Sequence, residues 1–535
     1  MGSRLLLALA LTASACGGGG GEAGDAGVDA LLPVDWTIDL DSAATAPISR
    51  ALLGQYDLSG ALFDYDQVPG LVDAMQGAGF AEWRVGAGRW ELATRLLPRL
   101  TNGTSCHFPL PEAFAPAGAD DLSLIAERDW FTDDGQAVTL ATTADDTRYA
   151  LGYVRHTVDV ATAFGARAYL SVDLMPRALA ANRTPERATA IIPDACNATF
   201  TNRVSNSPPA APDVFAAAVT GLVQRLVEGS GGEPGRAVRH VEVWNEPELA
   251  YFWDVGLDPD HTLFFDAAGQ ALVRLAAYRQ GSSRPEAQAL RFGFGSFASS
   301  ATAAAVIKQL DDNPIPGYGR IPCDFVSFHA YHSDPLVVVA AIEEVAAAVA
   351  ASTGYRDVEL VLAEWGPDLD ATGGDVAYAW STEPPLHAAT VIALGANAGL
   401  GRAHHAIFWD FYRWNAITWG LVDHDLQPKP LAYAYQLLAR AIPDGAVRLL
   451  PRAPANGRLD DGLGAVLATR DAGGTLRVLL VNRNEEWRTA RVLVDGVPGQ
   501  PAAVTAYLLP DGLVDGVLDP EIPVPPRALV LVELP

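Results

Sequence analysis

Residues 241–248 read Val-Glu-Val-Trp-Asn-Glu-Pro-Glu. The β-branched residues predict a strand, and Pro247 ends it because proline has no N–H to donate to the next ladder bond. Asn245 and Glu246 are therefore expected at the carboxyl end of that strand. A carboxylate beside an amide at such a position is suited to donate a proton to a polyhydroxylated substrate.

A second stretch of the same kind, Val-Glu-Leu-Val-Leu-Ala-Glu-Trp-Gly, occupies residues 358–366 and places Glu364 at another strand end. Paired carboxylates are what a glycosidase needs, about 5–5.5 Å apart for retention of configuration and about 6.5–9.5 Å apart for inversion. Sequence alone fixes neither separation. Either Glu by itself could be an ion-pair partner, whereas the pair favours catalysis.

The rest of the chain predicts a barrel around these two strands. Short apolar runs alternate with helix-patterned stretches, which indicates parallel strands buried on both faces. Eight such units predict a (β/α)₈ barrel over residues 45–445, with its chemistry at the carboxyl ends of the strands. The predicted strands are residues 51–56, 81–85, 166–172, 238–244, 291–296, 324–328, 358–363 and 405–409. The predicted helices include residues 69–76, 145–164, 212–227, 260–278, 336–351 and 386–397.

The pattern changes after the barrel. Short apolar runs separated by turn sequences such as Ala-Gly-Gly and Asp-Gly predict a β-sandwich over residues 446–535. These runs are residues 466–468, 476–481, 490–494, 504–508 and 528–532.

The N-terminus predicts export. Arg4, the apolar run 5–11 and the small residues before Cys16 form a lipoprotein signal over residues 1–16. Residues 17–44 begin with five glycines and are expected to be a flexible tether. We expect a bacterial lipoprotein anchored in the cell envelope through a lipid on Cys16. Because Ala13 stands where such signals usually have Leu, secretion without an anchor is the alternative.

The net charge, the cysteines and the histidines limit the partners, disulfides and metals that can be expected. The net charge of −27 would repel the phosphates of nucleic acid, so no nucleic-acid partner is expected. An oxidising compartment would allow Cys106 and Cys196 to form a disulfide, while Cys323 is expected to be a buried thiol. No cofactor or metal is expected, because the adjacent His404 and His405 should point to opposite faces of a strand.

Several motifs, in order along the chain, resemble glycoside hydrolase family 39, a branch of the retaining (β/α)₈ clan A that includes β-xylosidases and α-L-iduronidases. The motifs are Trp-Asn-Glu-Pro at 244–247, Cys-Asp-Phe-Val-Ser-Phe-His-Ala-Tyr at 323–331 and Ala-Glu-Trp at 363–365. Further matches are Asp-Leu-Met-Pro-Arg-Ala-Leu-Ala at 173–180, Trp-Gly-Leu-Val at 419–422 and Pro-Lys-Pro at 428–430. The resemblance covers residues 45–445 and extends to the trailing sandwich.

The resemblance implies a role for each candidate residue. Glu246 would be the acid/base and Glu364 the nucleophile, with Asn245 contacting the sugar 2-hydroxyl. Arg84 would hold the nucleophile and favour its ionised form, although a plain ion pair explains Arg84 equally well.

Further candidates come from the same resemblance. Tyr331 would donate a hydrogen bond to the nucleophile, and His329 would contact the sugar, although a lone histidine is more often a core residue. Trp409 would stack under the sugar. The aromatic residues that could line the same site, or belong to the core, are Trp365, Trp253, Tyr412 and Trp414.

Some positions depart from the family pattern. The His that usually follows the strand-two Arg is replaced by Gly-Ala-Gly at 86–88, and Ala363 precedes the nucleophile where Thr is more usual. Arg413 could bind a uronic acid carboxylate or pair with an acidic neighbour, and the second is favoured slightly. The expected function is a retaining glycosidase that acts on terminal glycosidic bonds of a carbohydrate. The alternative is a surface glycan-binding lipoprotein on a barrel that has lost catalysis.

Overall fold

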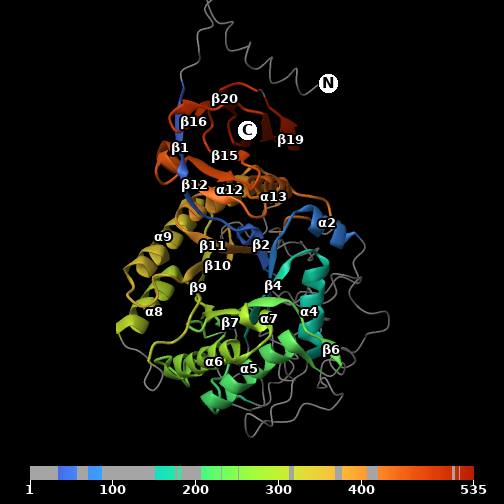
Figure 1. Cartoon of the computed structure of the whole chain (residues 1–535), viewed down its shortest axis with the longest axis vertical. Coiled ribbons are helices and arrows are strands. Elements are labelled where there is room, and N and C mark those ends of the chain that lie inside the picture. Colours follow the sequence, from blue (N-terminus) through green and yellow to red (C-terminus); the bar gives the residue numbers. More distant parts are fainter. Residues whose placement is uncertain are drawn as a thin grey trace, which may run out of the picture.

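The computed structural model describes residues 34–56, 70–86, 151–173, 175, 179–181, 206–230, 232–250, 252–312, 319–367, 376–406, 420–423, 425–508, 512–516 and 518–535. They form a closed barrel and a separate sheet domain stacked along the long axis of the molecule (Figure 1). The predicted fold class is therefore confirmed. Cys16, Cys106, Cys196 and Trp409, with Tyr412, Arg413 and Trp414, lie outside the described residues.

Eight parallel strands close the barrel in the order β10-β11-β2-β3-β4-β7-β8-β9. Their inward positions carry polar side chains near both ends, and their outward positions are apolar and covered by helices. The strands are β2 (Gly54–Tyr56), β3 (Glu82–Gly86), β4 (Arg167–Val172), β7 (Val238–Asn245), β8 (Arg291–Ser296), β9 (Phe325–Tyr331), β10 (Glu359–Gly366) and β11 (Leu400–Ala406).

Helices connect these strands and pack on the outside of the barrel (Figure 1). Pro at the first turn begins α5, α9, α12 and α13, where its missing N–H leaves no intrahelical bond unmade. The helices are α2 (Leu71–Gly77), α4 (Leu151–Ala163), α5 (Pro212–Glu228), α6 (Thr262–Gly281), α7 (Pro285–Gln288), α8 (Ser300–Asp312), α9 (Pro335–Ala351), α11 (Val376–Ala379), α12 (Glu383–Asn397) and α13 (Pro430–Ala441). A 3₁₀ turn, Arg50–Leu53, precedes β2, and a short hairpin, β5 (Gly229–Ser230) with β6 (Glu233–Pro234), follows α5. Among the described residues, no helix has both the length and the apolar character required to cross a membrane.

The second domain is one hydrogen-bonded sheet that encloses its own apolar core. The middle of β15, residues 478–481, is apolar on both faces. Val478 and Leu480 enter the core of this domain, whereas Leu479 and Val481 join the large core shared with the barrel helices. The strands are β1 (Trp36–Pro47), β12 (Val447–Ala453), β13 (Arg458–Leu459), β14 (Gly464–Arg470), β15 (Leu476–Asn482), β16 (Arg488–Val494), β17 (Val497–Pro498), β18 (Ala503–Leu508), β19 (Gly512–Asp515), β20 (Glu521–Val524) and β21 (Ala528–Leu534).

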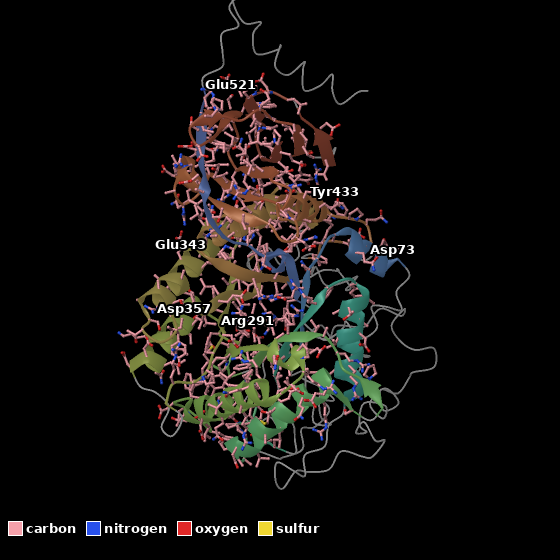
Figure 2. All side chains as sticks on the ribbon, viewed as in Figure 1. Asp73, Arg291, Glu343, Asp357, Tyr433 and Glu521 are labelled. Carbon is pink, nitrogen blue, oxygen red and sulfur yellow. The ribbon has the colours of Figure 1, made fainter. Side chains whose placement is uncertain are left out.

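The two domains are joined by α12 and α13, which lie between the barrel and the sheet (Figure 1). Tyr433 of α13, labelled in Figure 2, stacks on Tyr507 of β18 with ring centroids 6.1 Å apart. Apolar burial along this contact indicates that the sheet domain supports the barrel rather than moving freely beside it.

Some predicted boundaries are wrong. Residues 51–53, predicted to begin the first barrel strand, form the 3₁₀ turn before β2. The tether was expected to extend to residue 44, but residues 36–47 form β1, which pairs with β12 and with β16. Trp36, Ile38 and Leu40 alternate inward and are buried, so this segment belongs to the sheet domain. The eighth barrel strand was expected at 405–409, but β11 begins at Leu400 because Arg402 and His404 point into a polar layer of the barrel.

That polar layer is a buried ion network at the amino-terminal end of the barrel. Glu82 accepts hydrogen bonds from Arg402 and from Nε2 of His404 at 3.1 Å, and Arg402 also pairs with Glu359 at 3.0 Å. Burial alone would raise the pKa of Glu82, but the Arg402 charge and the histidine contacts outweigh it and lower this pKa strongly.

Replacing Glu82 by Leu is expected to lower the free energy of unfolding by about 3–5 kcal/mol, because Arg402 would remain buried without its main partner. Urea unfolding at neutral pH measures the effect. The double variant Glu82→Leu with Arg402→Met should recover much of the loss, since it removes both charges. A single variant as stable as the parent would show that the pair contributes nothing to folding.

Candidate active site

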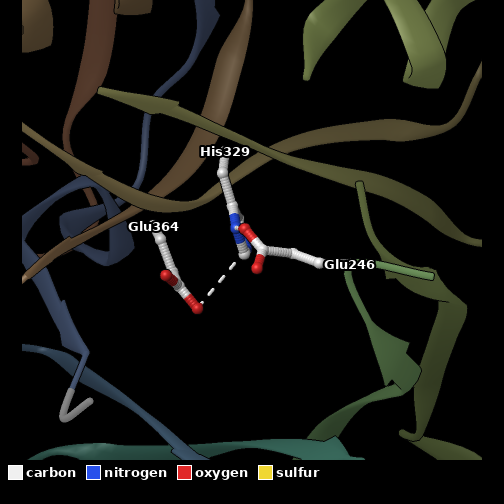
Figure 3. Close-up of side chains that lie close together, drawn as sticks. All are labelled: Glu246, His329 and Glu364. Carbon is white, nitrogen blue, oxygen red and sulfur yellow. Dashed lines mark hydrogen bonds and ion pairs between the residues drawn. The ribbon is translucent and has the colours of Figure 1, made fainter. Parts of the chain in front are cut away.

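The residues predicted to carry chemistry converge at the carboxyl ends of the barrel strands. Glu246 directly follows β7, Glu364 lies in β10, and His329 and Tyr331 lie in β9. Arg84 projects from β3 and reaches both Glu364 and Asn245. Figure 3 shows the imidazole of His329 between the two Glu side chains.

The end of β7 has an unusual backbone that aims these groups. Trp244 has φ of 89° and Glu246 has φ of 42°, a region that residues with a side chain seldom occupy. A Cβ atom on Gly295 would lie 2.3 Å from the carbonyl oxygen of Trp244, so only glycine fits beside this turn. Under strict alternation, Glu242 and Asn245 would face opposite sides of the strand; with this backbone both contact Arg84. Such strain is typical of functional sites.

The two carboxylates are close together. A carboxylate oxygen of Glu246 and one of Glu364 lie within 4.8 Å of each other and of a ring nitrogen of His329. Nδ1 of His329 is 2.6 Å from Oε1 of Glu246, and Nε2 is 3.5 Å from Oε1 of Glu364. This spacing is closer to the short carboxyl separation of retaining glycosidases than to the longer one of inverting enzymes.

The same three side chains are the one group of possible metal ligands found in the described part of the chain. Nδ1 of His329 is hydrogen-bonded to Glu246, and Glu364 is paired with Arg84, so an ion would have to compete with these contacts. The chemistry of a carboxylate pair does not require a metal.

Arg84 organises the floor of the site. Its Nη1 donates to Oε1 of Glu364 at 2.7 Å, its Nη2 donates to Oδ1 of Asn245 at 2.7 Å, and its Nε donates to Oε1 of Glu242 at 2.6 Å. The amide oxygen of Asn245 faces the guanidinium, which directs the amide N–H groups away from it. Tyr331 donates its hydroxyl to Oε2 of Glu364 at 2.9 Å, as predicted.

Glu242 is a residue of the site that sequence reasoning missed. It is fully buried and also accepts hydrogen bonds from Tyr169 and Ser296 and from Ser327. A Glu within an apolar strand run was the available signal, because a buried carboxylate needs a charged partner. Tyr56, at the end of β2, was also missed; the guanidinium of Arg84 lies 4.5 Å from its ring centroid.

Burial and charge act against each other in this cluster. Burial raises the pKa of Glu364, while the charges of His329 and Arg84 oppose that rise. The expectation that Arg84 favours the ionised form is therefore right in direction, but burial is the larger effect. Burial alone would lower the pKa of His329, yet the charges of Glu364 and Glu246 raise it above its usual value. The two carboxylates therefore favour the protonated form of His329.

Replacing His329 by Gln is expected to weaken the dependence of stability on pH. A histidine whose pKa is raised on folding contributes its full stabilisation of the folded state below its pKa in the unfolded chain, about 6.5. This stabilisation is lost as the pH rises through the pKa in the folded protein. The parent should therefore lose more free energy of unfolding than the variant between pH 7 and pH 9, measured with urea. His387→Gln is the control, since burial lowers the pKa of His387 to about 4 and its effect lies at lower pH. Equal losses in parent and His329→Gln would contradict the prediction.

Trp365 does not line the site, contrary to the prediction. It neighbours the inward-facing Glu364, so its indole faces the helices, where it has 0% exposure and lies 5.0 Å from His405 between ring centroids. Trp253 is likewise a core residue, packed edge-on against Trp244. Trp409, Tyr412 and Trp414 lie outside the described residues, so their predicted contacts with sugar stay predictions.

Comparison with solved structures agrees with this geometry. A GH39 β-xylosidase from Caulobacter crescentus matches with a TM-score of 0.58 and 16% identity, over 93% of this chain and 99% of that one. The chain has the fold of the family 39 glycosidases. A glucosidase from Croceicoccus marinus matches the same fold with a TM-score of 0.55 and 18% identity, over 94% of this chain and 99% of that one.

The family 39 fold is shared with other glycosidases that resemble the chain. A GH51 α-L-arabinofuranosidase from Thermotoga petrophila matches with a TM-score of 0.58 and 12% identity, over 94% of this chain and 100% of that one. No protein-family model and no curated protein matches the sequence.

Proposed function

We propose that the protein is a retaining glycoside hydrolase. The observation that carries the proposal is the pair of Glu246 and Glu364, whose carboxylate oxygens lie within 4.8 Å of each other at the carboxyl ends of two barrel strands. A fold shared with β-xylosidases, a glucosidase and an arabinofuranosidase supports it.

The geometry suits a double displacement. Glu364 attacks the anomeric carbon while Glu246 gives its proton to the leaving oxygen, which breaks the glycosidic bond and forms a glycosyl ester on Glu364. Glu246, now ionised, then takes a proton from water, whose oxygen attacks the anomeric carbon and frees Glu364. Arg84 and Tyr331 contact opposite oxygens of the Glu364 carboxylate, so both orient it and stabilise its charge when it leaves.

The proposal includes action on terminal sugars of a polysaccharide or oligosaccharide. Its support is the resemblance to family 39 and the β-xylosidases among the similar structures, since a β-xylosidase removes sugars from chain ends.

A panel of nitrophenyl glycosides tests the proposal. The panel spans α and β forms of xylose, arabinofuranose, glucose, galactose, fucose and glucuronic acid. Turnover of one sugar with retained configuration, followed by NMR of the first product formed, is the expected result. A folded protein that binds sugar in a calorimeter but cleaves no glycoside would favour the glycan-binding alternative instead.

We also propose that the protein is exported and anchored by a lipid on Cys16. The support is the signal-like sequence of residues 1–16 followed by glycines. Cell fractionation tests it: the parent should sediment with membranes, and the Cys16→Ser variant should not. A parent protein that stays in the soluble fraction would refute the anchor.

A further inference from the structure

Asp173 lies at the mouth of the barrel and has no role in the network below it. In β4, the side chains of Tyr169 and Ser171 point into the barrel, where Tyr169 donates to Glu242 and Ser171 contacts Arg84 at 3.3 Å. Side chains two residues apart in a strand face the same way, so Asp173 continues this inward row one layer closer to the carboxyl end. Asp173 is near enough to Glu364 for the two charges to interact.

The carboxyl group of Asp173 is close to the catalytic groups, yet one of its oxygens is unpaired. Its Oδ1 atom is buried and has no hydrogen-bond partner among the described residues. Charge interactions link Asp173 to Arg84, Glu242 and Glu364, but the guanidinium of Arg84 directs its hydrogen bonds to other side chains. A buried polar atom without a partner costs about 1–3 kcal/mol, so it is expected where a ligand supplies the missing bond.

We propose that Asp173 binds a hydroxyl group of the sugar that Glu364 attacks, and that it thereby favours neutral sugars over uronic acids. This inference rests on the proposed function and names the substrate class of the same site. Asp173 is half-buried, unlike the fully enclosed Glu242.

The charges around Asp173 account for the preference. Three of the described residues at the mouth carry a carboxyl group: Asp173, Glu246 and Glu364. The guanidinium of Arg84 is already shared by Glu242 and Glu364. A sugar that carries its own carboxylate would add a further negative charge, and the described cations beside the pair, Arg84 and His329, already pair with these carboxylates. Burial raises the pKa of Asp173 to about 7, so near neutral pH it can donate or accept a hydrogen bond to a hydroxyl.

A cycle of variants and deoxy-sugars tests the contact. The parent and Asp173→Ala are assayed on the nitrophenyl glycoside that the parent cleaves best and on the analogues that each lack one hydroxyl. Asp173→Ala should lower kcat/KM on the intact sugar about 10- to 100-fold. For one deoxy-sugar the same substitution should have almost no effect, because the hydroxyl that Asp173 binds is already missing. Equal losses on every analogue would show that Asp173 is merely structural and would overturn the proposal.

Asp173→Asn tests the charge preference while keeping the shape of the side chain. Its ratio of glucuronide to glucoside cleavage should rise at pH 8 relative to the parent; an unchanged ratio would refute the preference. Asp159→Asn, on the exposed face of α4, is the matched control and should leave the ratio of glucuronide to glucoside cleavage unchanged. Circular dichroism confirms folding of each variant. If the parent cleaves no glycoside, the proposed function fails, and the same deoxy-sugar cycle measured by calorimetric binding still decides the role of Asp173.

Discussion

Replacing Glu364 by Ala is expected to lower kcat for glycoside hydrolysis by at least about 10⁴-fold, the scale on which loss of a nucleophile acts. The carboxylate lies between the guanidinium of Arg84 and the hydroxyl of Tyr331 and has only 5% exposure. Glu242 is not placed to take its role, since its contacts are directed to Arg84, Tyr169 and serines. The measurement is release of nitrophenol by the parent and the variant on the best substrate of the panel.

Three controls make this result specific. Glu359→Gln changes a carboxylate in the same strand, β10, but at the opposite end of the barrel, and should leave kcat within a few-fold of the parent. Azide should restore turnover in Glu364→Ala by attacking the anomeric carbon in the space left by the carboxylate. Glu246→Ala should lose far less on an activated aryl glycoside than on a natural disaccharide, because a good leaving group needs little protonation. A folded Glu364→Ala protein with kcat near that of the parent would exclude the double displacement.

The barrel and its pair of carboxylates were predictable because their signals are local. Each central strand is a short apolar run, and Asn245, Glu246 and Glu364 stand where such runs end. Parallel strands in a barrel bring their carboxyl ends together, so residues far apart in the chain could be placed in one site from their sequence positions alone. The contact of Tyr331 with Glu364 was implied by the resemblance to family 39, and the structure confirms it.

The wrong predictions concern strand pairing between segments far apart in the chain, and side-chain direction along a strand. β1 has an alternating apolar pattern in Trp36, Ile38 and Leu40, but its partner strands lie more than 400 residues away in the chain, in β12 and β16. Trp365 follows Glu364 directly, so strand alternation already placed the two on opposite faces. By strand alternation alone, Glu242 and Asn245 would face opposite sides of β7, and only one of them could contact Arg84. Both reach Arg84 because Trp244 has a positive φ, which nothing in the sequence shows.

Replacing Arg84 by Met is expected to lower the free energy of unfolding by about 3–5 kcal/mol and to abolish most activity, because it leaves two buried carboxylates without their cation. Arg84 is 1% exposed, and its three nitrogens contact Glu242, Glu364 and Asn245, with further bonds to Ser171 and Ser296. Urea unfolding at pH 7 gives the stability, and nitrophenol release gives the activity. The loss of stability should shrink at lower pH, where protonation removes the unpaired charges.

A second substitution separates the structural role of Arg84 from its role in catalysis. In the double variant Arg84→Met with Glu242→Leu, the buried ion pair is replaced by apolar groups, so most of the lost stability should return. Activity should not return, because Glu364 still lacks the guanidinium that orients it and disperses its charge. Recovery of both properties would mean that Arg84 acts only through Glu242 and folding. Recovery of stability alone would mean that one guanidinium both holds the barrel interior together and positions the nucleophile.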